Sequence, residues 1–192
     1  MVTMGLRKRN TFEKYGEVFY VTTSVVDLKH VFTNKKYYEI LIFSLEFLKE
    51  KYNFRIIAYV LMPNHIHVII NFYEKPMVSE VMRDFKKYTS FKIRKLCEIE
   101  KRVEMLDYLR KNAENLSGQK FKLWDDRFDC LVITNEKTLR TKIEYIHNNP
   151  QKKGLVKNFI NWLYSSARNY YCSSGKTLLE IDKEFLVSGG NS

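Results

Sequence analysis

Two histidines separated by one residue lie in a run rich in β-branched residues, Pro63-Asn64-His65-Ile66-His67-Val68-Ile69-Ile70. Successive side chains of a β-strand point to opposite faces, so a strand here directs both imidazoles to one face. Two imidazoles at this spacing can bind one metal ion. The alternation predicts that Ile66, Val68 and Ile70 face a core, while the face of the histidines begins and stays polar. A pair of strand-end histidines bonded to the backbone is the alternative, and spacing alone leaves both open.

A tyrosine and an asparagine four residues apart form the second candidate feature. The segment 135–149 has helical periodicity, with Asn135 as the expected N-cap and Pro150 as the residue that ends the helix. Residues at i and i+4 share a helix face, so Tyr145 and Asn149 point the same way. His147 lies about 200° around the helix from Tyr145, and we interpret it as a packing or backbone-contacting residue rather than a third metal ligand. A helical tyrosine is more often structural than catalytic, so this pairing alone assigns no role.

The elements predicted around these residues follow the order β-α-β-β-α-β-α. We expect strands at 17–26, 54–61, 65–72 and within 121–134, helices at 34–52, 77–96 and 135–149, and a partly helical charged segment at 98–120. The short connection 62–64 makes the second and third strands antiparallel neighbours. This order predicts an α+β fold, an antiparallel sheet with flanking helices of the ferredoxin-like or split-βαβ type. An RNA-recognition module shares this plan, but none of the predicted strands carries its aromatic RNP1 pattern.

Composition favours an intracellular protein with a polyanionic partner. The chain has 192 residues, which we divide into one domain at 1–182 with a basic N-terminal arm and a tail at 183–192. With 33 Lys and Arg against 22 Asp and Glu, the net charge is +11, and nucleic acid is the first candidate partner. A merely soluble basic protein remains the alternative. No apolar run could span a membrane and no secretory signal is present, so we expect a cytoplasmic protein whose three cysteines are reduced packing residues.

Four sequence blocks, in the same order, resemble the Y1 transposases of the HUH superfamily. The resemblance is to the IS200/IS605 type, and within it to the REP-associated tyrosine transposases. It extends over about residues 10–182, and its blocks are 59–67, 82–90, 144–150 and 164–170. The resemblance implies an HUH-type fold in which His65 and His67 are metal ligands and Tyr145 is the nucleophile. It also implies that Asn149 completes the metal site.

Two departures from the family pattern bear on which DNA is recognised. Asp125 stands where Gln is common in the family. Gln151-Lys152 follows Pro150, where Val and another residue are usual. Neither departure falls on the four residues to which the resemblance gives a catalytic or ligand role.

The resemblance implies a transesterification of single-stranded or hairpin DNA that uses Mg²⁺ or Mn²⁺. Attack by the tyrosine leaves a 5′-phosphotyrosyl protein and a free 3′-hydroxyl. Two alternatives are a domesticated hairpin-binding protein that no longer cuts DNA and a hydrolase that uses a metal-bound water. We expect a monomer, with a homodimer that exchanges tyrosines as the alternative.

Basic residues are expected to contact DNA phosphates, which supplies affinity without reading sequence. A solvated charged surface is the alternative for each of them. The candidates are Arg7, Lys8, Arg9, Arg83, Lys86, Lys87, Arg94, Lys95 and Lys142.

Overall fold

The computed structural model describes residues 17–114, 118, 120–172 and 178–182. Three predicted features lie wholly or partly outside the described residues. They are the arm with Arg7, Lys8 and Arg9, the tail at 183–192 and, at 115–117 and 119, part of the charged segment at 98–120. The division into a domain at 1–182 and a tail therefore stays a prediction.

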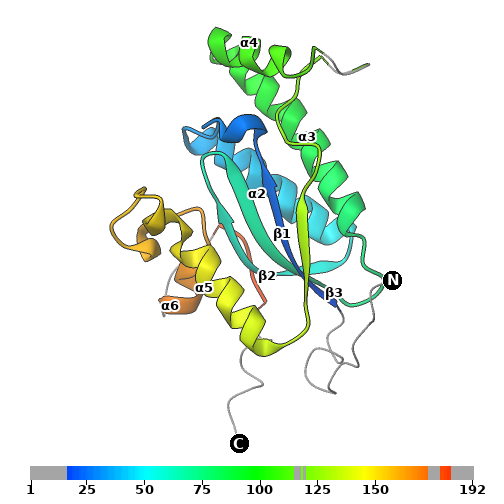
Figure 1. Ribbon diagram of the computed structural model, residues 1–192, viewed down its shortest axis with the longest axis vertical. Helices are drawn as coiled ribbons and strands as arrows, with labels where there is room; N and C mark the ends of the chain where they lie inside the picture. Colours follow the sequence, from blue (N-terminus) through cyan, green and yellow to red (C-terminus); the bar gives the residue numbers. More distant parts are fainter. Residues whose placement is uncertain (1–16, 115–117, 119, 173–177, 183–192) are drawn as a thin grey trace, which may run out of the picture.

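One four-stranded antiparallel sheet organises the molecule (Figure 1). Its strands are β1 (Glu17–Ser24), β2 (Phe54–Leu61), β3 (His65–Phe72) and β4 (Asp129–Ile133), in the order β2-β3-β1-β4. Strand β3 pairs antiparallel with both β1 and β2, so β1 and β2 run parallel on either side of it, which is the split-βαβ arrangement. The predicted α+β class is confirmed. The predicted strand-like stretch at 121–134 is shorter than expected, since only β4 joins the sheet there.

The helices follow the predicted order, with one short helix added. They are α2 (Lys35–Lys51), α3 (Val78–Ile99), α4 (Val103–Lys111), α5 (Glu136–Lys152) and α6 (Ala167–Tyr171), with 3-10 turns at Val26–Leu28 and Phe159–Asn161. Two helices begin at asparagine caps: Asn34 accepts a hydrogen bond from the Lys36 amide, and Asn135 accepts one from the Thr138 amide. These contacts satisfy amides that would otherwise lack partners in the first helical turn.

Helices cover both faces of the sheet (Figure 1). Helices α2 and α3 pack on the face to which Ile66, Val68 and Ile70 point. Helix α5 packs on the opposite face, where Ile69 is buried with a stripe of helix residues made up of Leu139, Ile143 and Ile146. The expectation that the histidine face stays polar is therefore wrong. Ile69 and Asn71 on that face are fully buried, because a second helical layer covers it.

Pro150 does not end α5, in contrast to the sequence prediction. The helix continues to Lys152, and Asn149 lies inside it. A proline inside a helix removes one hydrogen bond and crowds the preceding turn, at a cost of roughly 3 kcal/mol. Here Pro150 is buried in the last turn, and its carbonyl accepts a hydrogen bond from the Leu155 amide. Tertiary packing at the helix end thus outweighs the local preference, and Asn149 keeps a helical orientation.

The three cysteines are free thiols in different environments. Cys97 is buried, Cys172 is partly buried and Cys130 is exposed on β4. The expectation that all three are packing residues is therefore wrong for Cys130. No helix in the described part of the chain has the length and apolar character needed to cross a bilayer.

Removing the cap of α5 tests how strongly this helix depends on its first turn. We expect Asn135→Ala to lower the free energy of unfolding by about 1 kcal/mol, because the Thr138 amide loses its acceptor. Urea denaturation followed by circular dichroism measures the change. Asn34→Ala is the matched control on α2, with a similar expected loss. An Asn135→Ala protein as stable as the wild type would contradict this assignment.

Candidate functional site

Four side chains from β3 and α5 come together on the α5 face of the sheet. The ring centroids of His65 and His67 are 4.9 Å apart, and those of His67 and Tyr145 are 5.5 Å apart. Asn149 Nδ2 lies 3.0 Å from His67 Nε2. The strand alternation and the i, i+4 helix spacing thus converge on one place within one chain.

The site combines a buried imidazole with an accessible phenol. His67 is 5% exposed, because α5 lies over it, whereas Tyr145 is 43% exposed. His65, at the beginning of β3, is partly buried. The imidazoles are therefore shielded from solvent, whereas the phenol of Tyr145 is accessible to a large substrate.

Hydrogen bonds fix which nitrogen of each imidazole carries the proton. His65 Nδ1 lies 2.6 Å from Asn64 Oδ1, while Asn64 Nδ2 donates to the Leu28 carbonyl at 2.7 Å. An amide oxygen only accepts, so the proton of His65 is on Nδ1. In His67, Nε2 lies 3.0 Å from Asn149 Nδ2 and accepts from it in this orientation of the amide. Both imidazoles thus carry a lone pair on Nε2.

Burial keeps these imidazoles neutral. It lowers the pKa of His65 to about 4, with smaller contributions from the Lys153 and His30 charges. Burial also lowers the pKa of His67 to about 3, helped by the charges of His65 and Lys142. Neutral imidazole is the form that binds metal ions, so at neutral pH no proton has to leave before a cation binds.

Two nitrogen ligands and one amide form the candidate ligand set. Within the described residues, no three His, Cys, Asp or Glu side chains gather closely enough to hold a metal ion. A site built on His65 and His67 therefore depends on Asn149 and on oxygen atoms from water or substrate for its remaining ligands.

His147 lies away from this set, in agreement with its interpretation as a packing residue. It is fully buried, and its Nε2 lies 2.8 Å from Ser166 Oγ, so its contact is with a side chain rather than with the backbone. Burial lowers the pKa of His147 to about 4.

Sequence analysis missed two hydroxyl groups of β1 that contact His67. Thr22 Oγ1 lies 2.6 Å and Tyr20 OH 2.9 Å from His67 Nδ1. Strand alternation places Tyr20 and Thr22 on one face of β1, but only the pairing of β1 with β3 shows that this face is the histidine face. Lys152, which the sequence analysis also left unassigned, has its Nζ 5.8 Å from the Tyr145 ring centroid.

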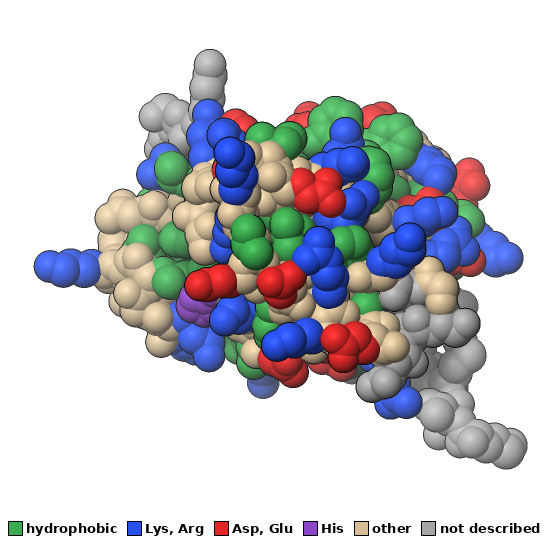
Figure 2. Space-filling model, turned by 90° about the horizontal axis from the view of Figure 1, so that it is seen from above, with side chains coloured by type: hydrophobic (Ala, Val, Ile, Leu, Met, Phe, Trp, Pro, Cys, Tyr) green, Lys and Arg blue, Asp and Glu red, His purple; other side chains and the backbone are tan. Residues whose placement is uncertain are grey.

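The candidate DNA-contacting residues of α3 differ in how far their charges are already paired. Arg83 bonds to Asp84, and Arg94 and Lys95 share Glu98. No carboxylate in the described part of the chain pairs with Lys87. Figure 2 shows Lys and Arg side chains spread over one end of the molecule with Asp and Glu among them.

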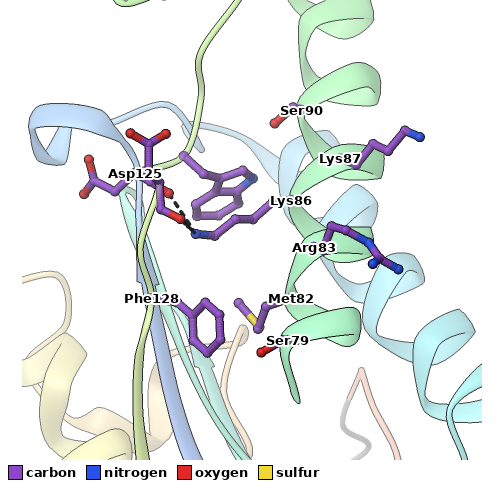
Figure 3. A pocket seen from close by; sticks show the side chains of 10 residues that line it. Ser79, Met82, Arg83, Lys86, Lys87, Ser90, Asp125 and Phe128 are labelled. Carbon is purple, nitrogen blue, oxygen red and sulfur yellow. Dashed lines mark hydrogen bonds between the residues drawn. The ribbon is translucent and has the colours of Figure 1, made fainter. Parts of the chain in front are cut away.

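Lys86 is occupied in holding the chain that enters β4. Its Nζ donates to the carbonyls of Asp125, Asp126 and Arg127, at 2.7, 3.3 and 2.9 Å. The side chain crosses a cavity of about 480 Å³ that Met82, Trp124 and Phe128 also line. Figure 3 shows Lys86 pointing across this cavity, while Arg83 and Lys87 point away from it. Lys142 lies elsewhere, with its Nζ 4.5 Å from the Tyr20 ring centroid beside the histidine site.

A four-stranded antiparallel sheet with a His-Ile-His strand beside a helical tyrosine is the arrangement implied by the resemblance to HUH proteins with one catalytic tyrosine. The family model of IS200-like transposases matches residues 20–149, and the chain belongs to this family. No curated protein sequence matches the chain.

Solved structures agree with this fold. A REP-associated tyrosine transposase bound to a REP hairpin has 22% sequence identity over 94% of this chain and 96% of its own, with a TM-score of 0.61. A proposed transposase from Deinococcus radiodurans R1 has 13% identity over 74% of this chain and 97% of its own, with a TM-score of 0.45. The first of these similarities supports the fold assigned above.

The buried imidazoles predict acid-sensitive stability. For His147 the pKa is about 4 in the folded protein against 6.5 for the ordinary side chain, so in this window the unfolded state binds more protons. Stability should therefore fall as the pH drops from about 6.5 towards 4. Urea denaturation in EDTA at several pH values measures this slope. We expect His147→Gln to make it shallower and His30→Gln, at an exposed histidine, to change it far less. Equal slopes in the wild type and His147→Gln would contradict this.

Proposed function

We propose that this member of the IS200-like transposase family is a metal-dependent single-stranded DNA endonuclease and strand transferase with Tyr145 as its nucleophile. The observation that carries the proposal is that the ring centroids of Tyr145 and His67 lie 5.5 Å apart, with His67 Nε2 facing Asn149. Family membership and the net charge of +11 support DNA as the substrate. Since a structural neighbour was solved with a REP hairpin, we propose a hairpin of this kind as the DNA.

His65, His67 and Asn149 would hold Mg²⁺ or Mn²⁺. Neutral imidazoles with Nε2 lone pairs fit this role, and their Nδ1 atoms already have oxygen partners. Asn149 would have to present Oδ1 in place of Nδ2, which rotation of its amide supplies. When bound, such a cation polarises the scissile phosphate and stabilises the negative charge that develops on it.

The side chains of this protein then have distinct tasks. The Tyr145 oxygen gives up its proton and bonds to the phosphorus as the bond from phosphorus to the 3′ oxygen breaks. The 3′ oxygen takes up one proton and leaves as a hydroxyl, so in net terms the phenol proton is transferred to it. The covalent link conserves the bond energy for rejoining, so no nucleotide cofactor is needed. Lys142 and Lys152 each have Nζ 5.8 Å from the Tyr145 ring centroid. Their positive charges attract the phosphodiester to the phenol.

A single chain supplies every residue of the proposed site. Helix α5 carries Tyr145 and packs on the sheet that carries His65 and His67 of the same chain. We therefore propose that the protein acts as a monomer, without exchange of tyrosines between subunits.

A denaturing gel tests the proposed chemistry directly. Hairpin-flanked single-stranded DNA with Mn²⁺ should give a covalent protein–DNA band, which Tyr145→Phe abolishes and EDTA prevents. Tyr171→Phe is the matched control, since Tyr171 is similarly exposed at 48% but lies on α6, and it should leave the band unchanged. Cleavage without the band would indicate a hydrolase that uses water. Binding without cleavage would indicate a DNA-binding protein, and either result would overturn the proposal.

Neighbouring lysines on α3 should respond differently to substitution. We expect Lys87→Ala to weaken DNA binding and to reduce the slope of log affinity against log salt by about 1, because its ammonium is free to contact a phosphate. Lys86→Met should instead lower the free energy of unfolding by roughly 0.5–1.5 kcal/mol, because three carbonyls of the chain that enters β4 lose their donor. Fluorescence anisotropy at several salt concentrations and urea denaturation separate the two effects. A salt slope unchanged in Lys87→Ala would reject the phosphate contact.

A further inference from the structure

The imidazole of His67 is enclosed by groups from β1 as well as from α5. Thr22 is the direct partner of His67 in the register between β1 and β3. The Tyr20 ring stacks on the His67 ring at a centroid distance of 5.6 Å and an interplanar angle of 18°. The hydroxyls of both residues reach Nδ1, at 2.6 Å from Thr22 and 2.9 Å from Tyr20. His67 therefore has two oxygen partners at one ring nitrogen and an amide at the other.

The Asn149 amide, in the orientation it has, donates to Nε2, and this contact puts the imidazole proton on Nδ1. The hydroxyls of Thr22 and Tyr20 can accept or donate, and they are the acceptors within reach of a protonated Nδ1. If Nδ1 carries the proton, it donates to a hydroxyl of β1, and Nε2 accepts from Asn149 Nδ2. If Nε2 carried the proton, it would face the hydrogens of the Asn149 amide. A proton on Nε2 would also remove the lone pair that a cation needs at that atom.

We infer that Thr22 and Tyr20 are positioning residues that hold the His67 proton on Nδ1 and so keep the Nε2 lone pair directed at Asn149 and the metal position. This inference rests on the proposed function for its link to a metal ion. The tautomer itself is a property of the metal-free protein and can be measured without DNA or metal.

The two hydroxyls differ in what else they contact. Tyr20 also touches the nucleophile, with its ring centroid 6.4 Å from that of Tyr145, and Lys142 Nζ lies 4.5 Å from the Tyr20 ring centroid. Loss of the Tyr20 hydroxyl alone leaves the stacked ring in place, so Tyr20→Phe removes one acceptor and little packing. Thr22→Val likewise replaces a hydroxyl by a methyl group of similar size. The pair of substitutions therefore removes both acceptors while conserving volume.

Nitrogen NMR of the metal-free protein is the first test. In protein with ¹⁵N-labelled histidine, protonated and unprotonated ring nitrogens have widely separated shifts, and the His67 signals are those lost in His67→Gln. The wild type should show a protonated Nδ1 and an unprotonated Nε2. Tyr20→Phe with Thr22→Val should move the proton to Nε2 in most molecules. A wild-type His67 protonated at Nε2, or a tautomer unchanged in the double variant, would overturn the inference.

Metal affinity is the second test. Isothermal titration with Mn²⁺ alone should show a Kd roughly 10–100-fold weaker in the double variant, as for other losses of groups that support a metal ligand. Thr22→Ser keeps a hydroxyl, so its Mn²⁺ affinity should equal that of the wild type, whereas the affinity of Thr22→Val should be lower. An Mn²⁺ affinity unchanged in a double variant whose tautomer has shifted would also overturn the inference.

Thr23→Val is the matched control for both measurements. Thr23 is buried on the other face of β1, and its hydroxyl has no hydrogen-bond partner in the described part of the chain. Its substitution should leave the His67 tautomer and the Mn²⁺ affinity unchanged. A shift as large as that of the double variant would show that any loss of a β1 hydroxyl perturbs the site, which would also overturn the inference. If the protein positions His67 as inferred but forms no covalent DNA adduct, the proposed function fails and the positioning role stands.

Discussion

The packing of α5 against the sheet is the constraint on which the rest of the site depends. A stripe of apolar residues buries one side of this helix against Ile69 and its neighbours on the sheet. The orientation of the helix that buries Ile146 also brings Asn149 Nδ2 to 3.0 Å from His67 Nε2. It leaves Tyr145 exposed to solvent. Because core and site share one helix, the burial of apolar surface fixes the relative position of the tyrosine and the imidazoles.

The same packing has an electrostatic consequence. A buried polar ring is costly unless its nitrogens find partners, and His67 meets this requirement with hydroxyls at Nδ1 and an amide at Nε2. Desolvation lowers the pKa of His67 to about 3, which keeps it uncharged at neutral pH. The helix layer therefore does more than hold residues together, since its burial of His67 also keeps this imidazole uncharged.

Periodicity was sufficient to predict what depends on local geometry. The spacing of His65 and His67 and the spacing of Tyr145 and Asn149 follow from the repeat of a strand or a helix. The cap at Asn135 follows from the residue type that precedes the helix. Long-range packing decided the rest: Ile69 faces a second helical layer, and burial keeps Pro150 within α5. The contacts of Lys86 with three carbonyls and of Thr22 with His67 join segments far apart in sequence, and no local pattern reveals such pairs.

The positively charged side chains differ in whether a carboxylate pairs with them, a difference that the net charge of +11 does not show. On α3, Asp84 pairs with Arg83 and Lys51, so this carboxylate offsets only one of its two cations. Glu98 is shared in the same way by Arg94 and Lys95. Lys86 keeps its charge, but its ammonium is held by the carbonyls of the chain that enters β4. Lys142 and Lys152 are different, because each lies beside the Tyr145 ring and has no carboxylate partner among the described residues. Lys87 on α3 also lacks a carboxylate partner among the described residues, but Lys142 and Lys152 are the two such lysines that lie beside the phenol of Tyr145. Under the proposed function, cations placed there align the phosphodiester with Tyr145, whereas exposed ion pairs elsewhere add little to stability.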